Sequence, residues 1–157
     1  GQMTTALVIS PDNVRDEDVV GLLAAHLTLM RSLSPPESTH ALDLEGLRAK
    51  NITFWRAEQD GDLVGCAALK ELDSVTGEIK SMHTAAAHRG KGIAAALLEH
   101  LLETAQARGY RELYLETGSQ PGFQPARALY ARYGFTECRP FADYREDPNS
   151  CFMTLRL

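Results

Sequence analysis

One short loop combines glycine and basic residues where a predicted strand is followed by a predicted long helix. Its sequence is Arg89-Gly90-Lys91-Gly92-Ile93-Ala94. Glycine lets the backbone approach a ligand closely, and the first NH groups of a helix have no partner within the helix. Together with the helix dipole, these groups can bind an anion such as a pyrophosphate. The spacing matches neither a GxxxxGK[ST] loop nor a GxGxxG loop, so this loop alone leaves an anion site and a plain structural turn open.

Two motifs, in the expected order, give this loop a context. Arg89, Gly92 and Ala94 match R/Q-x-x-G-x-G/A, and segment 126–135, which reads ARALYARYGF, matches AxxLYxxxGF. The chain therefore resembles the GNAT superfamily of N-acetyltransferases over nearly its whole length. The resemblance implies a GNAT α/β fold: a mixed, mostly antiparallel sheet of about six or seven strands, splayed between strands 4 and 5 and flanked by about four helices.

The activity implied by the resemblance is direct transfer of an acetyl group from acetyl-CoA, as co-substrate, to an amine in a ternary complex. The backbone NH groups of Gly90–Ala94 would hold the CoA pyrophosphate, with Arg89 and Lys91 adding positive charge. The pantetheine arm would enter an opening where a bulge separates strand 80–84 from strand 114–117. Three residues of strand 80–84 would lie along this arm: Met82, His83 and Thr84. The NH group of Met82 would support the thioester oxygen as charge develops.

Two side chains are candidates for the proton transfers of this reaction. An acceptor ammonium must lose a proton before it attacks, and Glu78 stands where some relatives keep a carboxylate. Its low ordinary pKa would require burial or a bridging water. Tyr130 stands at the family's position for the acid that protonates the leaving thiolate, and it would also contact the cofactor. The structural alternatives are a surface pairing of Glu78 with Lys80 or Arg111 and a plain core role for Tyr130.

Histidines near the loop suggest a general base, but their positions favour simpler roles. His83 lies on the strand face opposite Met82, and His88 precedes the turn, so a solvated or packed imidazole is the expectation for both. His26 lies on the apolar stripe of the first predicted helix. A core or groove position is therefore expected for it in place of ligand binding.

The segment between the first two predicted helices is expected to line the acceptor site, as it does in the family. It contains Pro35-Pro36, and two prolines stiffen a segment and so reduce the ordering cost of binding. We expect Arg31 or His40 to face a carboxylate of the acceptor, with Glu78 and Thr117 also in contact with the acceptor. A plain surface connector is the alternative.

Phe123 departs from the family pattern. The second motif usually opens with an asparagine at this position, which commonly hydrogen-bonds the pantetheine arm. Either another group replaces that contact or the arm lies differently. Phe123 is still expected to contact the cofactor.

Hydrophobic periodicity and turn residues predict the elements that position these side chains. The predicted strands are 5–10, 52–59, 63–72, 78–84, 111–116, 135–137 and 151–157. The predicted helices run from a cap at Asp12 or Asn13 to about Leu33, and over 43–50, 92–108 and 125–133. Asp60-Gly61 predicts a tight hairpin turn between the second and third strands.

Composition is typical of a single globular domain, expected here to span residues 1–157, with Gly1-Gln2 interpreted as a cloning remnant. Hydrophobic residues make up 44% and charged residues 24% of the 157 residues. The net charge of −5 gives no support for binding nucleic acid or an anionic membrane. Three cysteines without CxxC spacing favour reduced thiols, no metal site and a cytoplasmic location.

The sequence therefore predicts an acetyl-CoA-dependent N-acetyltransferase that acts on a small-molecule amine without a metal. Acetylation of a protein amine and a non-catalytic acyl-CoA-binding regulatory module are the alternatives. We expect no nucleic-acid or membrane partner. A homodimer is a further option, because superfamily members are often dimers.

Overall fold

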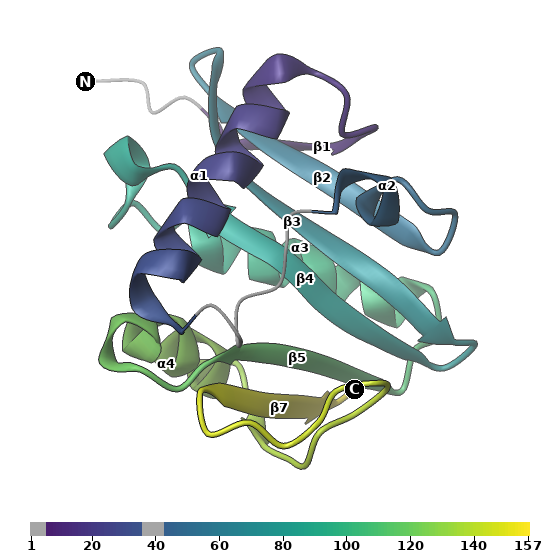
Figure 1. The fold of residues 1–157 in the computed structure, drawn as a ribbon. Helices are drawn as coiled ribbons and strands as arrows, with labels where there is room; N and C mark the ends of the chain where they lie inside the picture. Colours follow the sequence, from purple (N-terminus) through teal and green to yellow (C-terminus); the bar gives the residue numbers. More distant parts are fainter. Residues whose placement is uncertain (1–5, 36–42) are drawn as a thin grey trace.

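The computed structural model describes residues 6–35 and 43–157, so His40 and Gly1-Gln2 lie outside the described residues. Figure 1 shows one sheet with helices on both of its faces. The strands are β1 (Val8–Asp12), β2 (Ile52–Gln59), β3 (Asp62–Asp73), β4 (Thr76–Thr84), β5 (Glu112–Gly118), β6 (Thr136–Glu137) and β7 (Ser150–Arg156). The helices are α1 (Glu17–Leu33), α2 (Leu44–Leu47), α3 (Ile93–Ala107) and α4 (Gln124–Arg132), with 3-10 turns η2 (Ala86–His88) and η3 (Pro121–Phe123).

A 7-stranded sheet in the order β1-β2-β3-β4-β5-β7-β6 forms the centre of the fold. Neighbouring strands are antiparallel except for β4 and β5, which run parallel. A parallel pair needs a crossover connection, and α3 supplies it. These features confirm the predicted mixed, mostly antiparallel α/β fold.

The β2–β3 hairpin shows how a local signal sets the sheet. Asp60 and Gly61 have φ values of 54° and 80°, and positive φ at both central residues is typical of the type I′ turn that joins twisted antiparallel strands. The turn leads into a register in which Trp55 lies opposite Ala67. The predicted hairpin is therefore confirmed.

Two apolar layers hold the helices against the sheet. On the face covered by α1 and α2, Val19 and Leu23 pack with Phe54. On the other face, covered by α3 and α4 in Figure 1, Leu98 and Leu101 of α3 are fully buried. Burial of each such side chain contributes roughly 1.5–3 kcal/mol, so the sheet between these layers is a rigid support for a site.

The first strand starts later, at Val8, and ends later than predicted. β1 continues through Pro11 to Asp12, whereas the sequence predicted an end at Ser10. Proline lacks an NH group, but β1 is an edge strand that pairs only with β2, and an edge tolerates the missing donor.

The first helix begins later than predicted. Its N-cap residue is Asp16, not Asp12 or Asn13. The Asp12 carboxylate instead accepts a hydrogen bond of 2.8 Å from the NH group of Val14 and so closes a local turn before the helix. Such local bonds compete with helix formation.

Helix α2 covers Leu44–Leu47 of the predicted segment 43–50. It starts where the Asp43 carboxylate accepts a hydrogen bond of 2.9 Å from the NH group of Gly46. None of the helices in the described ranges is long and apolar enough to cross a membrane.

Candidate active site

β4 and β5 pair over only part of their length. Their parallel register ends with Ile79 opposite Leu115, and beyond this pair the two strands diverge in Figure 1. The predicted separation of strands 4 and 5 is therefore confirmed. One detail is corrected: within segment 114–117 the opening begins only at Glu116, because Tyr114 and Leu115 still pair with β4.

A β-bulge lies in β4 next to this opening. Ser81 and Met82 together stand opposite one residue of β3, Ala67. Ser81 has a φ of 55°, and its carbonyl accepts a hydrogen bond of 3.3 Å from the Cys66 thiol. A bulge interrupts the hydrogen-bond ladder locally and bends the strand. The bulge that the family resemblance implied is present, and Met82 lies within it.

The loop before α3 has the backbone conformation that an anion site requires. Gly90 and Gly92 have φ values of 78° and 79°, in the left-handed region that favours glycine. A Cβ atom at either position would meet nothing within 4 Å. Gly92 is the N-cap residue of α3, and no side chain in the described part of the chain caps this helix. Its first NH groups therefore fit an anionic group such as a pyrophosphate.

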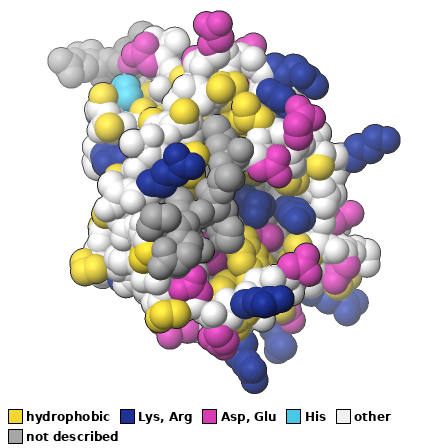
Figure 2. Space-filling view, viewed as in Figure 1, with side chains coloured by type: hydrophobic (Ala, Val, Ile, Leu, Met, Phe, Trp, Pro, Cys, Tyr) yellow, Lys and Arg dark blue, Asp and Glu magenta, His cyan; other side chains and the backbone are white. Residues whose placement is uncertain are grey.

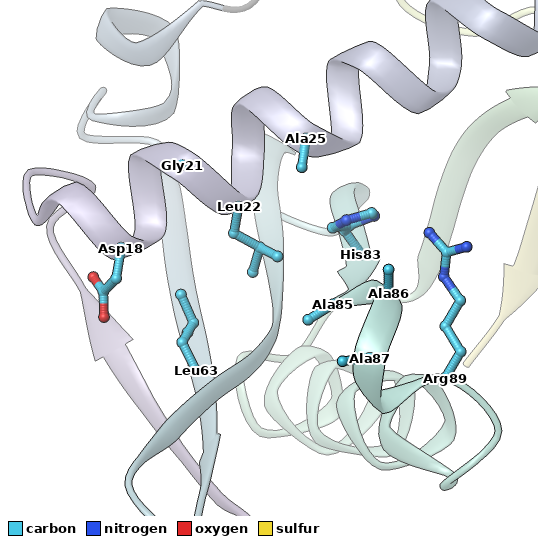
Figure 3. Close-up of a pocket in the computed structure, with 10 residues that line it drawn as sticks. All are labelled: Asp18, Gly21, Leu22, Ala25, Leu63, His83, Ala85, Ala86, Ala87 and Arg89. Atoms are coloured by element: carbon cyan, nitrogen blue, oxygen red, sulfur yellow. The ribbon is translucent and has the colours of Figure 1, made fainter.

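A cleft of about 540 Å³ lies between α1 and this loop. Figure 3 shows Leu22 and Ala25 on α1 facing His83 and Arg89 across it. Two of the predicted cofactor contacts, His83 and Arg89, thus line one cleft next to the glycine loop. Lys91, on the same loop, has its Nζ atom 3.3 Å from Nδ1 of His88.

Two histidines meet at the wall of this cleft. The Nδ1 atoms of His26 and His83 are 2.9 Å apart. Burial lowers the pKa of both to about 4, and His26 and Arg89 contribute to the decrease at His83. Of the two expectations for His83, a solvated or a packed imidazole, the structure has the packed one, and His26 lies at the groove as expected.

Tyr130 is buried on α4 and belongs to the larger apolar core. Its ring packs edge-on against Phe135, with centroids 5.7 Å apart. Burial raises the pKa of Tyr130 above its usual 10.0, and the Glu116 carboxylate raises it further. The phenol therefore keeps its proton at neutral pH, as an acid that protonates a thiolate must.

Glu78 is also buried, with 2% of its surface exposed. One of its carboxylate oxygens, Oε2, accepts hydrogen bonds from the Tyr144 hydroxyl at 2.7 Å and from Lys80 at 3.3 Å. The pairing of Glu78 with Lys80 was one of the alternatives that the sequence left open, but the sequence placed it at the surface and the structure buries Glu78. Tyr144 was not predicted as a partner. The role of Glu78 as proton acceptor stays a prediction.

A second carboxylate beside the opening was missed by the sequence analysis. Glu116 is the first residue of β5 beyond its pairing with β4, and it lies opposite Phe152 of β7. Burial raises its pKa from 4.5 to about 7; Glu78 adds to the increase and Lys80 opposes it. No motif marks Glu116. The sequence did contain one signal for Glu116. It directly follows the second of two leucines at alternate positions, in a strand next to the expected opening.

Aromatic side chains form a wall beside these carboxylates. The wall consists of Tyr114, Phe141, Tyr144 and Phe152, with neighbouring ring centroids 4.9 to 5.9 Å apart. On the face shown in Figure 2, hydrophobic side chains lie among both acidic and basic ones. The wall offers apolar contact, and Tyr144 links it to Glu78.

The remaining predicted contacts lie at the ends of β5 and α1. The Phe123 ring packs against Gly118, where an added Cβ atom would clash with it. Thr117 precedes this glycine and lies opposite Cys151 of β7. Arg31 is exposed in the last turn of α1.

Comparison with known proteins agrees with this geometry. Residues 15–135 match the model of the acetyltransferase (GNAT) family. The chain belongs to the GNAT family. It is 55% identical to the uncharacterized N-acetyltransferase YsnE of Bacillus subtilis over 149 residues, which cover 95% of this chain and 99% of the relative.

Solved structures of GNAT proteins share the fold. An acyl-CoA N-acyltransferase from Klebsiella pneumoniae superposes with a TM-score of 0.79 at 28% identity, covering 96% of this chain and 97% of the other. A GNAT family acetyltransferase from Elizabethkingia anophelis, solved with acetyl-CoA bound, gives a TM-score of 0.71 at 21% identity, covering 96% and 98%. The predicted acetyl-CoA-dependent N-acetyltransferase is confirmed at the level of the GNAT family, which uses acetyl-CoA.

Proposed function

We propose that this GNAT protein transfers the acetyl group of acetyl-CoA to the amine of a small-molecule acceptor, by direct attack in a ternary complex. The observation that carries the proposal is the opening between β4 and β5 beside the uncapped start of α3. The NH groups of Gly90–Ala94 would bind the pyrophosphate, with Arg89 and Lys91 at its edge. Met82, His83 and Thr84 would line the pantetheine arm from β4.

The acceptor would bind on the side of the opening where Glu78 and the aromatic wall lie. Buried carboxylates suit an ammonium group, and the wall favours a compact acceptor over a long protein segment. Thr117 and Phe123 would close the far end of β5, Phe123 against the arm and Thr117 against the acceptor. Arg31 would face an acceptor carboxylate from the end of α1.

Each proton transfer then has a candidate group. Tyr130, buried and protonated, would give its proton to the sulfur as the thiolate leaves. A carboxylate at the opening would take the proton of the acceptor ammonium, and Glu78 is the one that the sequence predicts. The Met82 NH group would stabilise charge on the thioester oxygen, where preorganised donors have their largest effect.

The test is an acceptor screen that measures release of the free CoA thiol. The panel contains amino acids, aromatic amines, polyamines and a peptide with a free N-terminus, each with acetyl-CoA. We expect turnover with at least one class of small amine and little with the peptide. Turnover with the peptide alone would replace the small-molecule acceptor by a protein amine. Binding of acetyl-CoA without turnover across the panel would contradict the proposal. The cytoplasmic location and the homodimer stay predictions from the sequence.

A further inference from the structure

We propose that Glu116 is the catalytic residue that takes the proton from the acceptor's ammonium, and that Glu78 is a positioning residue that holds Tyr144 and Lys80. This inference rests on the proposed function. It differs from the sequence-based expectation, which gave the proton-acceptor role to Glu78.

The position of Glu116 is the first argument. Leu115 is the last β5 residue that pairs with β4, so Glu116 lies where the opening begins. Leu115 faces the core under α3, and side chains alternate along a strand. The Glu116 side chain therefore lies on the opposite face of the sheet, where Glu78 bonds Tyr144.

The groups around Glu116 are the second argument. The charged and titratable groups that act on it or feel its charge come from β4, the segment before β7, α4 and β7: Glu78, Lys80, Tyr130, Tyr144, Asp147 and Cys151. Glu116 thus lies within electrostatic reach of both Glu78 and the proposed acid Tyr130.

The protonation of Glu116 agrees with this role. Its pKa is raised to about 7, first by burial and then by the like charges of Glu78 and Asp147, while Lys80 acts against the increase. A general base works best when its pKa lies near the pH at which it operates. A carboxylate with such a pKa can accept a proton at neutral pH.

The bonds of Glu78 point to a different task. Its Oε2 atom accepts from both Tyr144 and Lys80, and the Tyr144 ring packs against the aromatic wall. Removing this carboxylate would take a hydrogen-bond acceptor from each of these side chains, which are also bonded to each other at 3.3 Å. Glu78 therefore fixes the shape of the acceptor site, which is a positioning role.

The Glu116 carboxylate takes a proton from the acceptor's ammonium, and the amine lone pair forms the C–N bond at the thioester carbonyl carbon. The C–S bond breaks with its electron pair on sulfur, and Tyr130 gives that sulfur its phenolic proton. After the C–N bond forms, the attacking nitrogen carries two protons. One of them passes to the Tyr130 phenolate and the other stays on the amide, and Glu116 releases its proton to solvent. One proton is released per turnover.

The experiment compares Glu116→Gln with Glu78→Gln, and uses Glu103→Gln, an exposed residue of α3, as the matched control. With an acceptor found in the screen, the pH dependence of kcat/KM for the acceptor is measured for each. We expect Glu116→Gln to lower kcat about 100-fold or more and to remove the limb that rises with pH near 7. Glu116→Asp should recover part of kcat and restore the limb.

Glu78→Gln should change the acceptor KM and kcat but keep the rising limb, and Glu103→Gln should match the wild type. A rising limb that persists in Glu116→Gln would overturn the proposal, as would its loss in Glu78→Gln alone. Carbon-13 NMR titration of the glutamate carboxyls in the wild type and Glu116→Gln gives a readout without any acceptor. A Glu116 midpoint near the ordinary glutamate value would also overturn the proposal. Failure of the proposed function itself would appear separately, as a wild type that releases no CoA thiol.

Discussion

His26 on α1 and His83 on β4 contact each other through their Nδ1 atoms, 2.9 Å apart. One imidazole must donate its proton and the other must accept it, so the contact requires at least one neutral ring. The pair joins the helix on one face of the sheet to the strand that borders the opening. Its protonation therefore links the packing of α1 to the geometry of the site.

We predict that acid weakens the fold through this pair. Because burial lowers the pKa of both histidines from 6.5 to about 4, the unfolded chain binds protons before the folded one does. The contribution of this pair to the free energy of unfolding should be complete above pH 6.5 and should be lost as the pH drops from 6.5 toward 4. Urea unfolding at a series of pH values measures this decrease. His88→Gln, which leaves the pair intact, should show the same pH dependence as the wild type, and a flat profile in the wild type would contradict the prediction.

Replacing Tyr130 by phenylalanine should remove the proposed acid and keep the buried ring. We expect kcat to fall about tenfold to 100-fold, with the KM for acetyl-CoA unchanged. The matched control is Tyr133→Phe. Tyr133 lies at the end of the same helix, and its hydroxyl donates a hydrogen bond to Glu99 of α3. Normal turnover in Tyr130→Phe would remove this phenol from the mechanism.

Alanine at Gly92 should weaken binding of acetyl-CoA. The residue has a φ of 79° at the start of α3, so alanine costs about 1 kcal/mol of backbone strain and places a methyl group beside the proposed pyrophosphate. We expect the Kd for CoA, measured by calorimetry, to rise about tenfold or more.

Gly109→Ala provides the control for that variant. Gly109 has a φ of 80° and equally open surroundings just beyond the other end of α3. Both variants should lose similar stability, but only the Gly92 variant should lose affinity. Equal affinity in the two would show that the pyrophosphate does not bind at the start of α3.

Removing the Arg31 side chain tests the proposed acceptor carboxylate. Arg31→Ala should raise the acceptor KM several-fold, about the effect of losing one exposed charge interaction, and leave the KM for acetyl-CoA alone. Arg15→Ala, at another exposed position, serves as the control. If the acceptor KM of Arg31→Ala equals that of the wild type, the acceptor carries no carboxylate at this position.

The sequence predicted most elements because their signals are local. Asp60-Gly61 specified a turn, Gly92 and Gly109 bracketed α3, and the two motifs fixed the order of the remaining elements. Pro11 misled the prediction of β1, because the effect of proline depends on whether a strand lies at an edge, which is a property of the whole sheet.

The site was predicted in outline for the same reason. The glycine loop and Tyr130 lie in contiguous motifs, so their spacing was visible. Glu116 and Tyr144 come near Glu78 only through the pairing of distant strands and the packing of the segment before β7. A burial-induced pKa shift such as that of Glu116 arises from those long-range contacts and leaves no local pattern.

The extra residue in β4 also reverses which face of the sheet each later side chain of this strand lies on, compared with strict alternation. Ile79 points into the core under α3, and strict alternation from there would send His83 to that same aliphatic layer. Because Ser81 and Met82 share one place in the pleat, Met82 joins the core instead and His83 turns to α1. A regular pleat through Ser81 and Met82, with every residue kept and no bulge, would exchange a thioether for an imidazole between the sheet and α3, so the bulge decides which side chain enters that layer.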